Sequence, residues 1–213
     1  MLLIKDDSLV LFQGDSITDC GRDRNNPDDL GNGYPLLVAS LFNSLYPEKN
    51  VKFINRGISG NRVRNLKERW QEDCLDLKPD YVSILIGIND CWRRYDNNDP
   101  TSSSDYEKDY RYILEKTRDE LGAKLILLEP FVLPYPADRE AWREDLDPKI
   151  QVVRKLAREF DALYIALDGL FAEAASKAAP AYWAGDGVHP SPAGHGLIAR
   201  AWLEKVAGLD ISR

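Results

Sequence analysis

The chain has 213 residues, a length that predicts one domain over residues 1–213. Hydrophobic residues make up 44% of it and charged residues 30%, a balance that is typical of a globular protein and excludes a largely disordered one. Thirty-five acidic side chains against 28 basic ones give a net charge of −7, which disfavours nucleic acid and anionic membranes as partners because both attract basic surfaces.

Short apolar runs alternate with longer helical patterns along the chain. This alternation predicts an α/β fold of three layers, α/β/α, around a parallel sheet. The runs are nearly continuous in apolar residues, as expected of strands that are covered on both faces. Five strands are predicted, at Leu9–Gln13, Val51–Asn55, Tyr81–Ile86, Lys124–Glu129 and Leu163–Ala166.

Helices are predicted between these strands and after the last one. They lie at Tyr34–Leu45, Val63–Leu77, Tyr106–Leu121, Asp145–Phe160 and Leu170–Ala178. A final helix begins after Ser191 and Pro192, an N-cap residue followed by proline at the first helical position, and runs to about Val206. The polar stretch Tyr95–Asp105 shows no periodicity and is predicted to be a surface loop, either solvated or forming the rim of a site.

Four polar stretches lie where a site is expected. GDS (14–16), GISGN (57–61) and GIND (87–90) each follow a predicted strand, and DGVHP (186–190) lies nearer the C-terminus. Ligands of an open parallel sheet bind beyond the C-terminal ends of its strands. We therefore expect the first three stretches to line one edge of the sheet.

Ser16 has two interpretations at this point. Gly, Asp and Ser are ordinary turn and N-cap residues, so GDS alone favours a simple strand-to-helix turn. The alternative is a nucleophilic hydroxyl held at the edge of the sheet. The nucleophile elbow G-x-S-x-G is absent, since the stretch GISG (57–60) comes closest and fails at its last position.

The DGVHP stretch supplies a candidate base. His189 is one of two histidines, and Asp186 lies three residues before it. Pro190 favours an extended conformation at His189, and an Nδ1–H bond to Asp186 would leave Nε2 free to take a proton from a serine. A structural Asp-His pair that caps a loop is the alternative. His195 lies on the predicted last helix with no acidic residue within four positions, so we expect packing or surface exposure there.

Gly60 and Asn89 are candidates for stabilising developing negative charge. Gly60 permits a positive φ and a close approach of backbone amides, so the stretch around Ser59 is expected to supply N–H groups rather than a nucleophile. The Asn89 amide can donate without titrating, although a plain turn residue after a strand fits its position equally well.

The four stretches together resemble the blocks of the GDSL esterases of the SGNH hydrolase superfamily. Ser16 stands in GDSIT, Gly60 in GISGN, Asn89 in GIND, and His189 with Asp186 in DGVHP, in the order of that family. The resemblance implies a flavodoxin-like form of the α/β/α fold and chemistry without cofactor or metal.

The same resemblance implies a role for each residue. Ser16 would be the nucleophile, His189 the base, and Asp186 the group that orients the imidazole. The oxyanion hole would be formed by the backbone N–H groups of Ser16 and Gly60 and by the Asn89 side chain. Asp15 is expected to support the Ser16 corner rather than to take part in the chemistry.

Longer stretches resemble the cytoplasmic acetylxylan esterases of xylan-degrading bacteria. They are LFQGDSITDCGR, NRGISGNRVRNLKERW, KPDYVSILIGINDCWRRYD and VHPSPAGH. The likeness implies a small acetylated sugar or xylo-oligosaccharide as substrate, and a homo-oligomer. In that group an aromatic residue precedes the catalytic Asp, whereas Gly185 stands here, so the acyl or sugar pocket is expected to differ. Trp92 and Trp183 either wall that pocket or belong to the core.

Other functions are weighed against this one. A general short-chain carboxylesterase, or a lysophospholipase or thioesterase of the same superfamily, would favour an apolar acyl tunnel, but the loops NNPDDLGNG and YDNNDPTSSSD are polar. A non-catalytic carbohydrate-binding protein is expected to lack a triad residue, and none is missing. A metallohydrolase needs clustered ligands, which two histidines without H-x-H or H-x-x-x-H spacing do not supply.

The cysteines and the N-terminal stretch predict a cytoplasmic protein. MLLIKDDSL carries charge from Lys5 onward and has no room for the apolar core of a secretory signal. Cys20, Cys74 and Cys91 are odd in number and lack metal-type spacing, so we expect reduced thiols.

Overall fold

The structure is a computed structural model that describes residues 3–209. A five-stranded sheet lies at its centre, and each strand pair is parallel. The strands are β1 (Leu9–Gly14), β2 (Lys52–Asn55), β3 (Tyr81–Leu85), β4 (Lys124–Leu128) and β5 (Leu163–Ile165). Their order is β2-β1-β3-β4-β5, the flavodoxin-like order, so the predicted fold class is confirmed.

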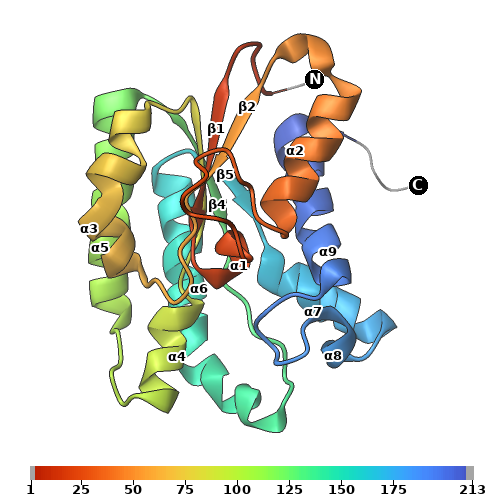
Figure 1. The fold of residues 1–213 in the computed structure, drawn as a ribbon. Coiled ribbons are helices and arrows are strands. Elements are labelled where there is room, and N and C mark those ends of the chain that lie inside the picture. Colours follow the sequence, from red (N-terminus) through yellow and green to blue (C-terminus); the bar gives the residue numbers. More distant parts are fainter. Residues whose placement is uncertain (1–2, 210–213) are drawn as a thin grey trace.

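Helices cover both faces of the sheet (Figure 1). They are α1 (Ser16–Asp19), α2 (Tyr34–Leu45), α3 (Val63–Asp73), α4 (Ile88–Asp96), α5 (Ser103–Leu121), α6 (Arg143–Glu159), α7 (Leu167–Lys177), α8 (Pro180–Trp183) and α9 (Pro192–Trp202). Short 3-10 turns lie at Pro47–Lys49, Leu75–Leu77 and Ala137–Trp142, and a π-helical turn at Leu203–Ala207. Among the described residues, no helix is long and apolar enough to cross a membrane.

Alternate residues of β1 build the two cores. Phe12 packs with Phe42 of α2 and Trp202 of α9 on one face, and Leu11 packs with the residues of α3, α5 and α6 on the other. This alternation follows from the strand period of two, which sends successive side chains to opposite faces. The sheet is therefore buried on both sides, and the loops at its two ends are the places where a site can form.

The starts of two long helices follow from local chemistry. The Ser191 hydroxyl accepts the N–H of Gly194 at 3.2 Å at the start of α9, and Pro192 occupies the first helical position. The Ser102 hydroxyl accepts the N–H of Asp105 at 3.0 Å at the start of α5.

Helix α4 is absent from the sequence prediction, and the predicted loop Tyr95–Asp105 is wrong at both ends. Its first residues complete α4 and its last residues begin α5, which leaves residues 97–102 as the connection. Helix α4 has only nine residues, and its buried residues include the polar Asn89 and Asp90, so few apolar positions mark it in the sequence.

Smaller differences concern helix boundaries. The predicted helix Val63–Leu77 ends at Asp73, and a separate turn follows it. Helix α7 begins at Leu167 instead of Leu170, and α6 begins at Arg143 instead of Asp145. These shifts leave the predicted topology unchanged.

Candidate active site

Ser16 and His189 meet beyond the C-terminal ends of the strands. Ser16 is the first residue of α1 and is separated from β1 by Asp15 alone, and His189 lies in the loop between α8 and α9. Oγ of Ser16 is 2.9 Å from Nε2 of His189. Nδ1 of His189 is 2.6 Å from Oδ2 of Asp186. The structure thus brings the three side chains of the predicted triad into one hydrogen-bonded row.

The loop that carries Asp186 and His189 orients both side chains. Oδ1 of Asp186 accepts the backbone N–H of Val188 at 2.9 Å and that of His189 at 2.7 Å. A bridge between Ala184 and Pro190 closes this loop at its base. The carboxylate is therefore fixed by one oxygen, while the other faces the imidazole.

The Asp186–His189 contact shifts both pKa values. Burial opposes the charge on Asp186, but the hydrogen bonds from the His189 ring and from two backbone N–H groups outweigh it and hold the pKa of the carboxyl far below its usual range. The hydrogen bond to Asp186 raises the pKa of His189, against the opposing effect of burial. The side chains of His189 and Asp186 remain 46% and 39% exposed, so the row is open to solvent.

Asp15 lies behind Ser16 and is completely buried. Its Oδ1 accepts the N–H of Ile17 at 3.0 Å and so caps α1. Burial raises the pKa of the Asp15 carboxyl to about 7. Because this contact caps the helix that begins at Ser16, it is consistent with the prediction that Asp15 holds the Ser16 turn in place.

The loop after β2 carries Gly60 at a φ of +81°. A Cβ added there would meet nothing within 4 Å, so it is the backbone conformation, and not a lack of space, that favours glycine. The preceding Ser59 donates its N–H and its hydroxyl to Oδ2 of Asp19, at 2.9 and 3.1 Å. Ser59 is thus occupied by a structural contact, and the N–H of Gly60 is the predicted oxyanion donor of this loop.

Asn89 lies in the first turn of α4 and is 3% exposed. Its Nδ2 donates to the carbonyl oxygen of Asn61 at 3.0 Å, directly after Gly60. This contact joins α4 to the Gly60 loop. A side-chain amide nitrogen carries two hydrogens, so the contact with Asn61 leaves the second one for a substrate oxygen.

His195 is buried in α9, so its packing alternative holds. Its Nδ1 accepts the N–H of Tyr34 at 3.1 Å, and its Nε2 lies 3.4 Å from Sγ of Cys20. Burial lowers the pKa of His195 to about 4. The imidazole joins the starts of α2 and α9 and takes no part in the row of Ser16 and His189.

The two predicted substrate-binding tryptophans lie in different surroundings. The Trp92 ring is half-buried, with its centroid 5.8 Å from that of the His189 ring. The indole N–H of Trp183 donates to the Ala174 carbonyl of α7 at 3.0 Å. Trp183 also lines a hollow between α7 and α9 that contains none of the triad residues. The structure brings Trp92 to the triad and places Trp183 against α7.

Two further residues support this site without belonging to a recognised pattern. Asp19 holds the Ser59 turn and is itself paired with Arg24 at 2.6 Å. Arg139 donates from Nε to the carbonyl oxygen of Asp186 at 3.2 Å. The GDSITD run contains Asp19, but nothing in its spacing pairs it with a serine 40 residues later. Arg139 lies in a stretch without any motif.

Within residues 3–209, no group of three or more His, Cys, Asp or Glu side chains is arranged to hold a metal ion. The polar side chains that converge beyond the strand ends are a hydroxyl, an imidazole and a carboxylate. Such a set is suited to acyl transfer through a serine.

Known proteins resemble the chain over most of its length. Residues 12–197 match the GDSL-like Lipase/Acylhydrolase family. An acetylxylan esterase of Geobacillus stearothermophilus is 40% identical over 205 residues, which are 92% of this chain and 93% of the relative. A structure described as a GDSL-like lipase from Parabacteroides merdae has a TM-score of 0.92 at 39% identity and covers 95% of this chain and 97% of its own.

Structures of Axe2, an acetylxylan esterase from Geobacillus stearothermophilus, are also similar. One has a TM-score of 0.89 at 38% identity and covers 98% of both chains. Three others are described as catalytic mutants, with alanine in place of a serine, a histidine or an aspartate. That histidine follows that aspartate by three positions, as His189 follows Asp186. A tryptophan directly precedes the aspartate in Axe2, where this chain has Gly185.

The match over residues 12–197 and the identity of 40% across nearly the whole length show the relationship. The chain belongs to the GDSL-like lipase/acylhydrolase family and is a carboxylic ester hydrolase.

Proposed function

We propose that this esterase removes O-acetyl groups from acetylated xylo-oligosaccharides or related carbohydrates through an acetyl-enzyme on Ser16. The observation that carries the proposal is the row Ser16–His189–Asp186, with contacts of 2.9 and 2.6 Å. These are the distances that proton transfer from a serine to an oriented imidazole requires.

In the first half of the reaction, Oγ of Ser16 attacks the acetyl carbonyl while Nε2 of His189 takes the hydroxyl proton. Asp186 holds the imidazole in the right tautomer and stabilises the imidazolium that forms. His189 then gives the proton to the departing sugar oxygen. In the second half, a water molecule loses its proton to His189 and attacks the acetyl-enzyme, and acetate leaves.

The oxyanion of each tetrahedral intermediate accepts hydrogen bonds from three donors. These are the backbone N–H groups of Ser16 and Gly60 and the side-chain amide of Asn89. Such donors act on charge that exists only near the transition state, and the loss of one costs about 3 kcal/mol of barrier.

The substrate class is supported by two observations. The acetylxylan esterase of Geobacillus stearothermophilus is similar over nearly the whole chain. The half-buried Trp92 ring also lies beside His189, where an indole can pack against a sugar ring. Simple short-chain esters, or the longer acyl esters of a lysophospholipase or thioesterase, are the competing substrates.

Acetate release from acetylated xylo-oligosaccharides tests the proposal. The parent protein, Ser16→Ala and the control Ser44→Ala, an exposed serine of α2, are assayed in the presence of EDTA. We expect the parent and Ser44→Ala to release acetate at equal rates, and Ser16→Ala to fall by about 10³-fold or more.

Each outcome decides a different part of the proposal. Full activity of Ser16→Ala would overturn the mechanism. Cleavage of an aryl acetate by the parent without acetate release from the sugars would leave the mechanism standing and overturn the substrate. Loss of the parent's activity in EDTA would contradict a reaction without metal.

The cellular setting is proposed along the same lines. We propose a cytoplasmic homo-oligomer that acts on small sugars and binds neither nucleic acid nor membrane. The net charge of −7 supports the expectation that the protein binds neither nucleic acid nor membrane. The free thiols of Cys20, Cys74 and Cys91 support a reducing compartment.

A further inference from the structure

The segment that follows β4 packs against the loop of Asp186 and His189. The N–H of Leu133 donates to the carbonyl oxygen of Gly187 at 2.9 Å. Gly187 has a φ of +81°, and a Cβ there would lie 2.1 Å from the carbonyl oxygen of Tyr135. The two backbones are so close that only glycine fits at position 187. The chain beyond Tyr135 also contacts the triad loop, through Arg139.

Arg139 makes the second contact between these segments. Its side chain is 13% exposed, and its Nε donates to the carbonyl oxygen of Asp186 at 3.2 Å. Asp186 lies in a turn, where its carbonyl is not part of a helix or a strand. The carbonyl therefore accepts a hydrogen bond from another segment of the chain, in addition to the contacts that the loop makes within itself.

The same guanidinium lies over two indole rings that pack against each other, with ring centroids 5.1 Å apart. Its central carbon is 4.1 Å from the centroid of Trp142 and 5.3 Å from that of Trp92. The Trp92 ring in turn lies beside His189, with ring centroids 5.8 Å apart. Arg139 thus contacts the backbone of the triad carboxylate and the aromatic ring that flanks the triad imidazole.

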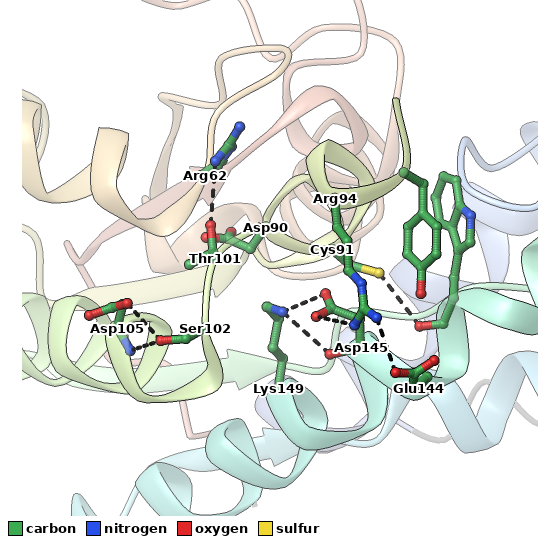
Figure 2. Close-up of polar contacts among 12 residues, drawn as sticks. Arg62, Asp90, Cys91, Arg94, Thr101, Ser102, Asp105, Glu144, Asp145 and Lys149 are labelled. Atoms are coloured by element: carbon green, nitrogen blue, oxygen red, sulfur yellow. Dashed lines mark hydrogen bonds and ion pairs between the residues drawn. The ribbon is translucent and has the colours of Figure 1, made fainter. Parts of the chain in front are cut away.

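The elements that carry these residues are firmly joined, as Figure 2 shows for α4 and α6. Sγ of Cys91 lies 3.6 Å from the carbonyl oxygen of Trp142. Arg94 of α4 contacts Glu144 at 3.0 Å and Asp145 at 3.4 Å at the start of α6. Arg139 lies in the turn Ala137–Trp142, directly before α6, so these contacts hold its backbone in place. Its side chain can therefore hold the triad loop in position.

We propose that Arg139 is a positioning residue of this esterase, which holds Asp186 and Trp92 in register with His189. The inference deepens the proposed function and rests on it, because it requires that His189 be the base. Arginine suits the task because its planar guanidinium can stack on an indole while an N–H in its plane donates to a carbonyl. A lysine ammonium makes one of these contacts well, but not both at once.

Two variants separate the contacts of Arg139. Arg139→Met keeps an unbranched apolar stem against the indoles and removes the donor and the charge, whereas Arg139→Lys keeps the charge. With an aryl acetate, we expect kcat of Arg139→Met to fall by about 10- to 100-fold, since a small misplacement of reacting groups costs rates of that order, while KM changes little. Arg139→Lys should recover part of kcat.

Arg143→Met is the matched control. Arg143 begins α6 a few residues further on and pairs with Asp168 at 2.5 and 2.9 Å, without touching the triad loop. Its replacement removes a partly buried ion pair from the same region, so we expect a lower melting temperature with an unchanged kcat. Equal losses of kcat in Arg143→Met and Arg139→Met would assign the effect to general loosening and overturn the proposal.

The remaining outcomes separate this inference from the proposed function. A kcat of Arg139→Met equal to that of the parent, with Ser16→Ala inactive, would overturn the role of Arg139 alone. Activity of Ser16→Ala would overturn the proposed function and the inference together. If Arg139→Met fails to fold, Arg139→Lys decides: a parental kcat and pH profile would contradict the role, and a reduced kcat in a folded protein would support it.

Discussion

Asp186 illustrates how single residues set the chemistry of this site. One carboxylate oxygen accepts hydrogen bonds from two backbone N–H groups of its own loop, and the other accepts a hydrogen bond from Nδ1 of His189. The first pair of contacts fixes the direction of the second, so the imidazole has one orientation toward Ser16. The activity should therefore depend on pH through the protonation of His189.

The acid limb of the kcat/KM profile should lie above the ordinary His value of 6.5, because the hydrogen bond to Asp186 raises the pKa of His189 and only the neutral imidazole takes the serine proton. Activity should be lost as the pH falls through that raised pKa. Asp186→Asn removes the charge, so we expect the limb to move to lower pH and kcat to fall by about 10⁴-fold. Initial rates with an aryl acetate across the pH range measure both.

Asp15 provides the control for that profile. Its carboxyl has a pKa of about 7 and also interacts with His189, so it could produce a limb in the same range. Asp15→Asn keeps an acceptor for the N–H of Ile17 and removes the titration. A limb that moves in Asp15→Asn and stays in place in Asp186→Asn would contradict the assignment to His189 and Asp186.

Asn89 gives a second prediction at this scale. Asn89→Ala removes the proposed side-chain donor, so kcat for an aryl acetate should fall by about 10²-fold with little change in KM. Asn89→Asp preserves the size and places an acceptor where the donor stood, and it should be at least as impaired. Steady-state kinetics of the two variants decide, and an Asn89→Asp variant as active as the parent would remove Asn89 from the oxyanion hole.

Helix α9 shows how an element is tied to the site without sharing its chemistry. His195 accepts the N–H of Tyr34 with Nδ1, so the neutral ring carries its hydrogen on Nε2, toward Sγ of Cys20. Protonation would place a second N–H against that of Tyr34. The start of α9 is therefore held to α2 and to the end of α1 only while His195 is neutral.

This contact predicts a loss of stability in acid. Burial lowers the pKa of His195 to about 4 in the folded protein, against 6.5 in the unfolded chain, so the unfolded state binds the proton first. The free energy of unfolding should fall as the pH drops from 6.5 toward 4, by about 2 kcal/mol between pH 7 and pH 5. Urea unfolding of the parent and of His195→Gln, which does not titrate, measures the difference.

The comparison with His195→Gln is needed because other buried groups titrate in the same range. The carboxyls of Asp15 and Asp90 have pKa values of about 7, raised by burial, and they act in the opposite direction. A parent and a variant with the same pH dependence of unfolding would show that the contact with Tyr34 does not discriminate between the two states of His195.

Elements and site residues can be predicted from the sequence where their contacts are made between residues that are close together along the chain. The strands are predicted well because burial on both faces leaves continuous apolar runs, whereas α4 is missed because Asn89 and Asp90 occupy its buried face. GDS, GISGN, GIND and DGVHP can be recognised because each keeps its chemistry within a few neighbouring residues. Arg139 cannot, since its contact with Asp186 spans 47 residues and involves a backbone carbonyl.

The whole molecule separates stability from chemistry by place. The two apolar cores lie between the sheet and its helices, and the polar row begins at Ser16, the first residue of α1, beyond the end of β1. Substitutions in the row should therefore affect rates more than folding. Open parallel sheets commonly have this arrangement, with the site at the C-terminal ends of the strands and the core between sheet and helices.

The size of the particle in solution is the prediction that belongs to this scale. The resemblance to acetylxylan esterases predicts a homo-oligomer, and sedimentation equilibrium should give a mass that is a multiple of one chain. The measurement is made at two protein concentrations and in high salt to exclude loose association. A mass of one chain under all of these conditions would show that the molecule works as a monomer.

The exposure of His189 and Asp186, 46% and 39%, bears on what the acetyl group meets after it leaves the substrate. An acetyl group on Ser16, beside such an open pair, would be accessible to small alcohols as well as to water. Water has the advantage of concentration, and an alcohol supplied at high concentration should compete with it. We therefore expect part of the acetyl to appear as a new ester, with the protein acting as a transferase, and the ratio of ester to acetate should rise with the alcohol.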